Sequence, residues 1–171
     1  MPTRHFILVC WLSLLLPTVW AASYQPPFSP RLTLDFNRDW RFYRGDVTNA
    51  TDPLFDDTAW SYVSTPHTFN DVDTFDNIIT KGGERDLFEG VTWYRKHFTL
   101  PIGAKAGKAF LEFEGLRQAA WFYLNGQLVG TYENGVTACG IDITAVARYG
   151  AETNVLAVKV DNSHDYREAA T

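Results

Sequence analysis

Three carboxylates that follow the last strand-like segment are the side chains best suited to chemistry. They are Asp161, Asp165 and Glu168. Two carboxyl groups about 5 to 5.5 Å apart can serve as nucleophile and acid/base in retaining cleavage of a glycosidic bond. The simpler interpretation is a solvated acidic loop, because Asp and Glu are mostly exposed in folded proteins. We favour the solvated loop as far as catalysis is concerned.

The histidines and cysteines offer little further chemistry. His67 follows a proline at the entry of a loop, where a lone histidine is more typical of a structural hydrogen bond than of a ligand. His97 lies in a strand-like segment and is expected to be packed or exposed, whereas His164 could contact a ligand. No spacing of His, Cys and carboxylates matches a zinc site, and we predict no metal and no cofactor.

The N-terminal segment resembles a secretory signal peptide. Arg4 supplies the positive charge, and the apolar run 6–16 is broken only by Ser13. Eleven residues are too few for a membrane-spanning helix, which needs about 20. We expect cleavage after about Ala21, with Ser23 as an alternative. The signal peptide is therefore 1–21, and the product is secreted or periplasmic with no remaining membrane segment.

The rest of the chain has the composition of one globular domain. Residues 22–30 form a proline-rich linker, and 31–171 form the domain. The formal charge is −5, with no stripe of Lys and Arg, so nucleic acid is not an expected partner. Cys139 is alone once Cys10 leaves with the signal, which excludes an internal disulfide.

At least three of the four remaining tryptophans are expected in the core, because aromatic side chains in strands mostly bury their area. These tryptophans are Trp40, Trp60, Trp93 and Trp121.

Short strands must position these residues. Alternating or β-rich patterns predict strands over 32–36, 40–42, 61–65, 93–100, 109–114, 119–124, 127–132 and 155–160. Asn125-Gly126 predicts a two-residue type I′ hairpin turn, since both positions require φ > 0. Leu156, Val158 and Val160 are expected to face inward. The polar segment 67–90 is a long loop of the kind that is usually functional or flexible. The pattern indicates an all-β, antiparallel β-sandwich.

Seven segments in order resemble one family. They are LDFNRDWRF (34–42), FDDTAW (55–60), TPHTFN (65–70), WYRKHFTLP (93–101), FYLNGQLVG (122–130), IDIT (141–144) and NVLAVKVDNS (154–163). Together they resemble the N-terminal sugar-binding domain of glycoside hydrolase family 2, which includes β-galactosidases, β-glucuronidases and β-mannosidases.

The resemblance implies a jelly-roll, galactose-binding-like β-sandwich. In that family an immunoglobulin-like domain and a catalytic TIM barrel follow this first domain, and the barrel carries the catalytic acid and the nucleophile. It therefore implies a C-terminally truncated domain, with no catalytic residue of its own. The implied parent is an exported glycosidase that acts on a β-linked sugar, most simply a β-galactoside.

The same resemblance implies a few residues at the rim of the substrate pocket. An acidic residue just past the last strand, Asp161 or Asp165, hydrogen-bonds sugar hydroxyls, with Asn162 beside it. A second contribution comes from Glu89, where some relatives carry Asn. The alternatives are a free-standing carbohydrate-binding module, which would display an exposed aromatic platform, and a purely structural domain.

Overall fold

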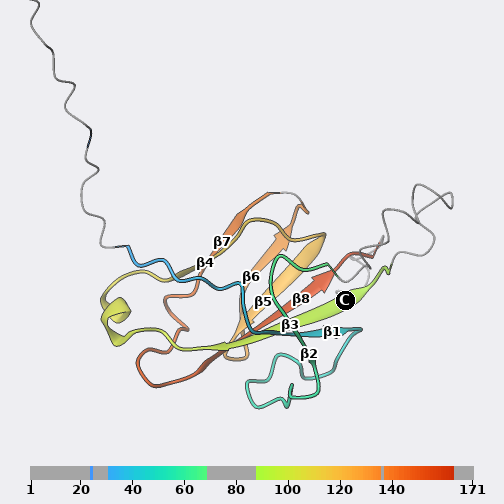
Figure 1. Cartoon of the computed structure of the whole chain (residues 1–171), viewed down its shortest axis with the longest axis horizontal. Helices are drawn as coiled ribbons and strands as arrows, with labels where there is room; N and C mark the ends of the chain where they lie inside the picture. Colours follow the sequence, from blue (N-terminus) through green and yellow to red (C-terminus); the bar gives the residue numbers. More distant parts are fainter. Residues whose placement is uncertain (1–23, 25–30, 69–87, 136, 164–171) are drawn as a thin grey trace, which may run out of the picture. The chain divides into compact units, whose positions relative to one another are not determined.

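The structure is a computed structural model that describes residues 24, 31–68, 88–135 and 137–163. All of its strands lie within the unit Leu32–Thr171. They are β1 (Trp40–Arg44), β2 (Ser61–Val63), β3 (Val91–Phe98), β4 (Phe110–Phe113), β5 (Ala119–Leu124), β6 (Gln127–Glu133), β7 (Cys139–Asp142) and β8 (Asn154–Asp161), with one 3₁₀ turn, η2 (Ile102–Ala106) (Figure 1). No helix among the described residues is long and apolar enough to cross a membrane.

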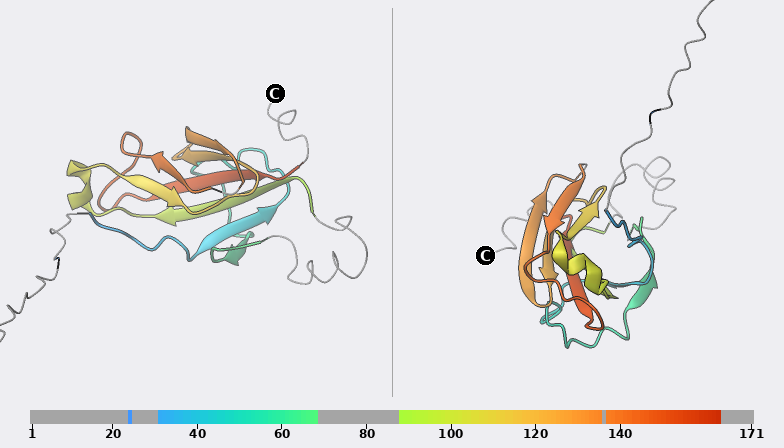
Figure 2. Two further views of the ribbon diagram at one scale, coloured as in Figure 1. Left: turned by 90° about the horizontal axis from the view of Figure 1, so that it is seen from above. Right: turned by 90° about the vertical axis from the view of Figure 1, so that its left-hand side faces the viewer.

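The strands form two antiparallel sheets. The larger has the order β2-β1-β3-β8-β5-β6, and the smaller pairs β4 with β7. Figure 2 shows the small sheet over one face of the large one, and the buried side chains between them form the main core. These side chains are Trp40, Leu111, Ala120, Phe122, Leu124, Tyr132, Ile141, Ile143, Leu156, Val158 and Val160. The expected all-β sandwich is therefore confirmed.

Strand β8 is buried on both of its faces. Leu156, Val158 and Val160 point into the main core, as their alternation predicts. On the opposite face, Ala157 lies in a second apolar cluster with Ala50, Trp60 and Trp93. Residues between β1 and β2 thus cover the outer face of the sheet, and β8 is a central strand with little exposed surface.

Three of the four described tryptophans are buried, as the sequence predicts. Trp40, Trp60 and Trp93 are buried, and Trp121 is half-buried on β5. The amine of Lys159 lies 5.8 Å from the Trp121 ring. The described residues therefore show no pair of exposed tryptophans that would form a stacking platform for sugars.

The Asn125-Gly126 turn adopts the predicted hairpin geometry. Asn125 has φ 52° and Gly126 has φ 87°, and Leu124 pairs with Gln127 across the turn. The side-chain Nδ2 of Asn125 donates to Asn154 Oδ1 at 3.0 Å, and the side-chain Oδ1 of Asn125 accepts from the Val155 backbone amide at 3.0 Å. This polar side chain therefore ties the hairpin to the start of β8 and has a structural role.

The predicted strand over 32–36 is wrong. These residues carry no strand pairing, and Leu32 and Leu34 are 60% and 48% exposed. Phe36 alone anchors the segment, because its ring meets Trp40 and Phe98 edge-on and its carbonyl accepts from Trp40 Nε1 at 2.8 Å. Alternation of apolar residues here reflects one buried ring and not a half-buried strand. The other predicted strands are present, with ends shifted by a few residues.

A buried arginine on β3 organises the loop between β1 and β2. The side chain of Arg95 is fully buried, and its Nε donates to Asp57 Oδ2 at 2.8 Å. Its guanidinium also donates to the backbone carbonyls of Ala50, Asp52 and Phe55. Since an isolated buried charge is costly, these acceptors are what allow Arg95 to lie inside. One side chain thus fixes four points of the loop.

Asp57 is held in its charged form by this cluster. Burial alone would raise the pKa of the Asp57 carboxyl, but hydrogen bonds from Arg95 and His97, and their charges, outweigh burial and lower it. His97 Nε2 lies 2.8 Å from the same oxygen, Asp57 Oδ2. His97 is therefore both partly exposed and paired.

Removing the Asp57 charge should destabilise the domain strongly. We expect Asp57→Asn to lower the free energy of unfolding by about 3–5 kcal/mol, because Arg95 keeps a buried charge without its counter-ion. Urea denaturation of the purified chain measures the change. Lys108→Ala is the matched control, since it breaks an exposed ion pair with Asp142 and should change stability little.

The same variant has a defined pH dependence. A carboxyl with a lowered pKa stabilises the fold above its unfolded pKa, and that contribution disappears as the pH falls through the folded value. The difference between the original chain and Asp57→Asn should therefore be full at neutral pH and shrink below about 3.8. A difference that is constant down to pH 2 would refute the assignment of the effect to this ionised carboxyl.

Close approach of the two sheets requires glycine at position 130. A Cβ atom on Gly130, in β6, would lie 2.8 Å from Ile141 Cδ1 and 3.2 Å from its Cγ2. Ile141 belongs to β7 and to the main core, so it has little room to move. Packing density in such interiors leaves no space for an added side chain.

A side chain at this position should separate the sheets. We expect Gly130→Val to destabilise the chain by about 1–3 kcal/mol through overpacking, measured by thermal denaturation. Gly140→Val is the control, because a Cβ on Gly140 of β7 meets nothing within 4 Å. Equal effects of the two substitutions would contradict the close-approach argument.

Candidate functional site

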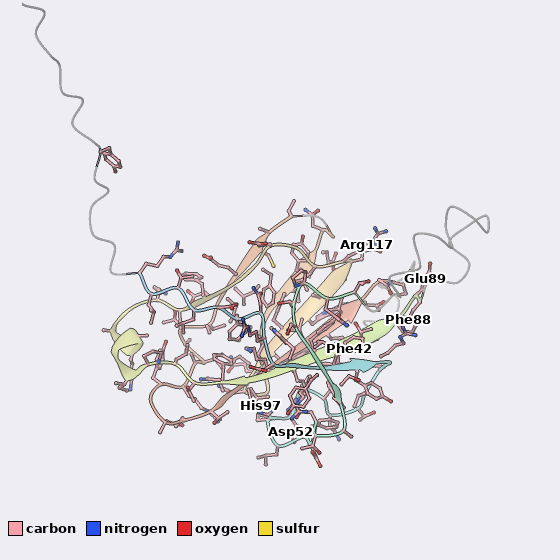
Figure 3. All side chains as sticks on the ribbon, in the orientation of Figure 1. Phe42, Asp52, Phe88, Glu89, His97 and Arg117 are labelled. Atoms are coloured by element: carbon pink, nitrogen blue, oxygen red, sulfur yellow. The ribbon has the colours of Figure 1, made fainter. Side chains whose placement is uncertain are left out.

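Three of the residues predicted for the pocket rim meet at one end of the large sheet. Strand β8 ends at Asp161, which pairs with Val91 at the start of β3 and with Ala119 at the start of β5. Asn162 follows Asp161, and Glu89 precedes β3, so the antiparallel pairing brings them together. Figure 3 shows Phe88, Glu89 and Arg117 at this same end of the sheet. Asp165, the fourth predicted residue, lies outside the described residues.

Asp161 is integrated into the backbone of this end. The residue is 1% exposed, and its Oδ1 accepts from the Ser163 amide at 2.8 Å. Its carbonyl accepts from the Gln118 amide at 3.3 Å, which attaches the start of β5. The carboxylate therefore closes a local turn just after β8.

Asn162 binds the segment that precedes β3. Its Oδ1 accepts from the Gly90 amide at 2.8 Å, and its Nδ2 donates to the Phe88 carbonyl at 2.9 Å. Its own amide donates to the Gly90 carbonyl at 3.3 Å. Glu89, between these two residues, is exposed.

Two arginines and one aromatic ring complete this end. The Arg44 guanidinium lies 5.0 Å from the centre of the Phe88 ring, and Arg117 is exposed beside the start of β5. Sequence reasoning did not select the two arginines, and it named Phe88 only as a neighbour of Glu89. Arg44 ends β1 and Arg117 precedes β5, and only their shared position at one sheet end distinguishes them. The Glu89 carboxylate and the Arg117 guanidinium are the exposed groups at this end, and both can hydrogen-bond sugar hydroxyls.

His67 makes the structural contacts that the sequence predicts. Its Nδ1 lies 2.9 Å from the Tyr94 hydroxyl, and its ring meets Phe42 edge-on. Burial lowers the pKa of His67 and raises the pKa of Tyr94. The pair is therefore uncharged near neutral pH and belongs to the packing of β1 against β3. His164 lies outside the described residues.

No metal site is visible in the part of the chain that the structure describes. None of its groups of His, Cys, Asp or Glu brings three such residues together for a metal ion. Cys139 is half-buried and unbonded, and burial raises the pKa of its thiol. Glu168, the third carboxylate of the acidic segment, lies beyond the described residues.

Comparison with known proteins gives consistent relatives. A β-glucuronidase from Formosa agariphila is 44% identical over 136 residues, which cover 78% of this chain and 14% of that protein. The β-galactosidase BoGH2A from Bacteroides ovatus is 38% identical over 145 residues, which cover 84% of this chain and 17% of that protein. The chain thus spans about one-sixth or less of the length of these relatives.

Solved structures agree with these relatives. A β-glucuronidase from glycoside hydrolase family 2 superposes with a TM-score of 0.69 at 43% identity, covering 78% of this chain and 14% of that one. β-Glucuronidase 2 from Bacteroides uniformis, covalently bound to cyclophellitol-6-carboxylate aziridine, gives a TM-score of 0.67 at 36% identity, covering 75% and 14%.

A family model described as "Glycosyl hydrolase 2 galactose-binding domain-like" matches residues 84–171, which include the sheet end formed by Glu89, Asp161 and Asn162. This chain therefore belongs to the family of galactose-binding-like domains of glycoside hydrolase family 2.

Proposed function

We propose that this chain is the non-catalytic N-terminal domain of an exported family 2 glycosidase. It supports a catalytic barrel, which supplies the nucleophile and the acid/base, and it lends polar residues to the rim of the substrate pocket. The observation that carries the proposal is that exposed Glu89 and Arg117 lie at the sheet end where Asp161 and Asn162 hold the backbone. Membership of the family and the small share of each relative that the chain covers support it.

A β-linked glucuronide is the substrate class that we propose for the parent enzyme. The relative at 44% identity and the structure at 43% identity are both β-glucuronidases. The sequence alone favoured a β-galactoside. Because the relative BoGH2A is a β-galactosidase, the assay below also includes a β-galactoside. Exposed Arg117 at the rim is also compatible with an anionic sugar.

We assign the sugar contact to Asp165 and a supporting role to Asp161. Asp161 is almost completely buried and already accepts the Ser163 amide, so a sugar hydroxyl has little access to it. Asp165 is the other acidic residue that the resemblance places just past the last strand. Export is proposed on the N-terminal pattern of a positive charge, an apolar run and small residues, with residues 1–21 as the signal peptide.

A domain exchange tests this function. This chain replaces the aligned segment of the Formosa agariphila β-glucuronidase, and we expect the chimera to hydrolyse an aryl β-glucuronide. Asp165→Asn should lower kcat/KM about 10–100-fold without a change in melting temperature. The substitution replaces the charged carboxylate that accepts a hydrogen bond from a sugar hydroxyl with a neutral amide. Asp161→Asn should mainly lower the melting temperature.

Asp142→Asn, an exposed position on β7, is the control and should leave kcat/KM unchanged. A folded chimera without activity would refute the supporting role. Activity toward an aryl β-galactoside with none toward the glucuronide would reassign the substrate class.

A further inference from the structure

Asn162 makes contacts that differ from those of a sugar-binding side chain. The β3–β8 ladder ends at the pair Val91 and Asp161. One more backbone bond follows, from the Asn162 amide to the Gly90 carbonyl. Gly90 has φ 138°, a conformation that side-chain-bearing residues rarely adopt, and regular backbone pairing with β8 ends here.

The side chain of Asn162 replaces the backbone pairing that is lost there. Its oxygen accepts from the Gly90 amide and its nitrogen donates to the Phe88 carbonyl, at 2.8 and 2.9 Å. A carboxamide carries the same donor and acceptor as a peptide group. Asn162 thus acts as one further peptide unit of β8 and carries the hydrogen bonding as far as Phe88, three residues before β3.

We infer that Asn162 is a positioning residue, which holds the segment 88–90 as a fixed wall of the pocket rim and does not itself bind the sugar. That this segment borders a substrate pocket rests on the proposed function. Each half of its amide group bonds the protein backbone, and these two bonds fix the orientation of the side chain. Glu89 lies between the two bonded residues, so its exposed carboxylate takes its position from Asn162.

Amide hydrogen exchange of the full chain tests the contact. We expect Asn162→Ala to accelerate exchange of the Gly90 amide about tenfold, as loss of one hydrogen bond implies. Asn162→Asp keeps an acceptor oxygen and should leave the Gly90 amide slow. Asn134→Ala, an exposed position after β6, is the control and should change neither. Unchanged exchange in Asn162→Ala would overturn the inference.

Kinetics of the chimera test the consequence. Displacing a wall that contacts ground state and transition state alike should raise KM for the glucuronide about threefold or more with kcat nearly unchanged. An unchanged KM together with faster Gly90 exchange would overturn the positioning role. A raised KM with unchanged Gly90 exchange would show a direct sugar contact instead. If the unsubstituted chimera is inactive, the proposed function fails, and the exchange result still decides the contact.

Discussion

The fully buried guanidinium of Arg95 is the constraint on which the arrangement depends. A charge inside the sheet is tolerated only with a complete set of acceptors, and the loop between β1 and β2 supplies them as the Asp57 carboxylate and three backbone carbonyls. The loop therefore lies on the outer face, where Trp60 and Trp93 close a second apolar cluster over Ala157. With both faces covered, β8 has one position in the sheet, and the residues that follow it emerge at a defined point.

At that point, some residues support the backbone and others remain exposed for contact. Asp161 closes a turn, and the Asn162 side chain bonds the segment that precedes β3. Glu89 and Arg117 remain exposed around them. The hydrogen bonds of Asp161 and Asn162 to the backbone restrict the movement of this end of the sheet. In the proposed function, this sheet end determines the geometry of a pocket whose reacting groups belong to another domain.

Local patterns in the sequence predicted most of the strands, but they missed β7 (Cys139–Asp142) and did not predict the site. The Asn125-Gly126 turn and the alternation of β8 follow from φ preferences and side-chain period, which are properties of neighbours in sequence. The segment 32–36 imitated that period with only one side chain, Phe36, in the core. The burial of Arg95 could not be predicted from its neighbours in sequence, because its acceptors lie 38 to 45 residues away. The contact between Asn162 and Gly90 spans 72 residues, so the role of Asn162 becomes visible only in three dimensions.

Calorimetric titration of the isolated chain with sugars tests the central claim most directly, because a supporting domain and a carbohydrate-binding module differ in their own affinity. The ligands are glucuronic acid, galactose, mannose and a β-linked oligosaccharide. We predict no saturable heat at ligand concentrations below the millimolar range, since in the proposed function this chain supplies only one wall of the pocket. Saturable binding that is lost in Asp161→Ala or Asp165→Ala would contradict this account and identify the chain as a carbohydrate-binding module in its own right.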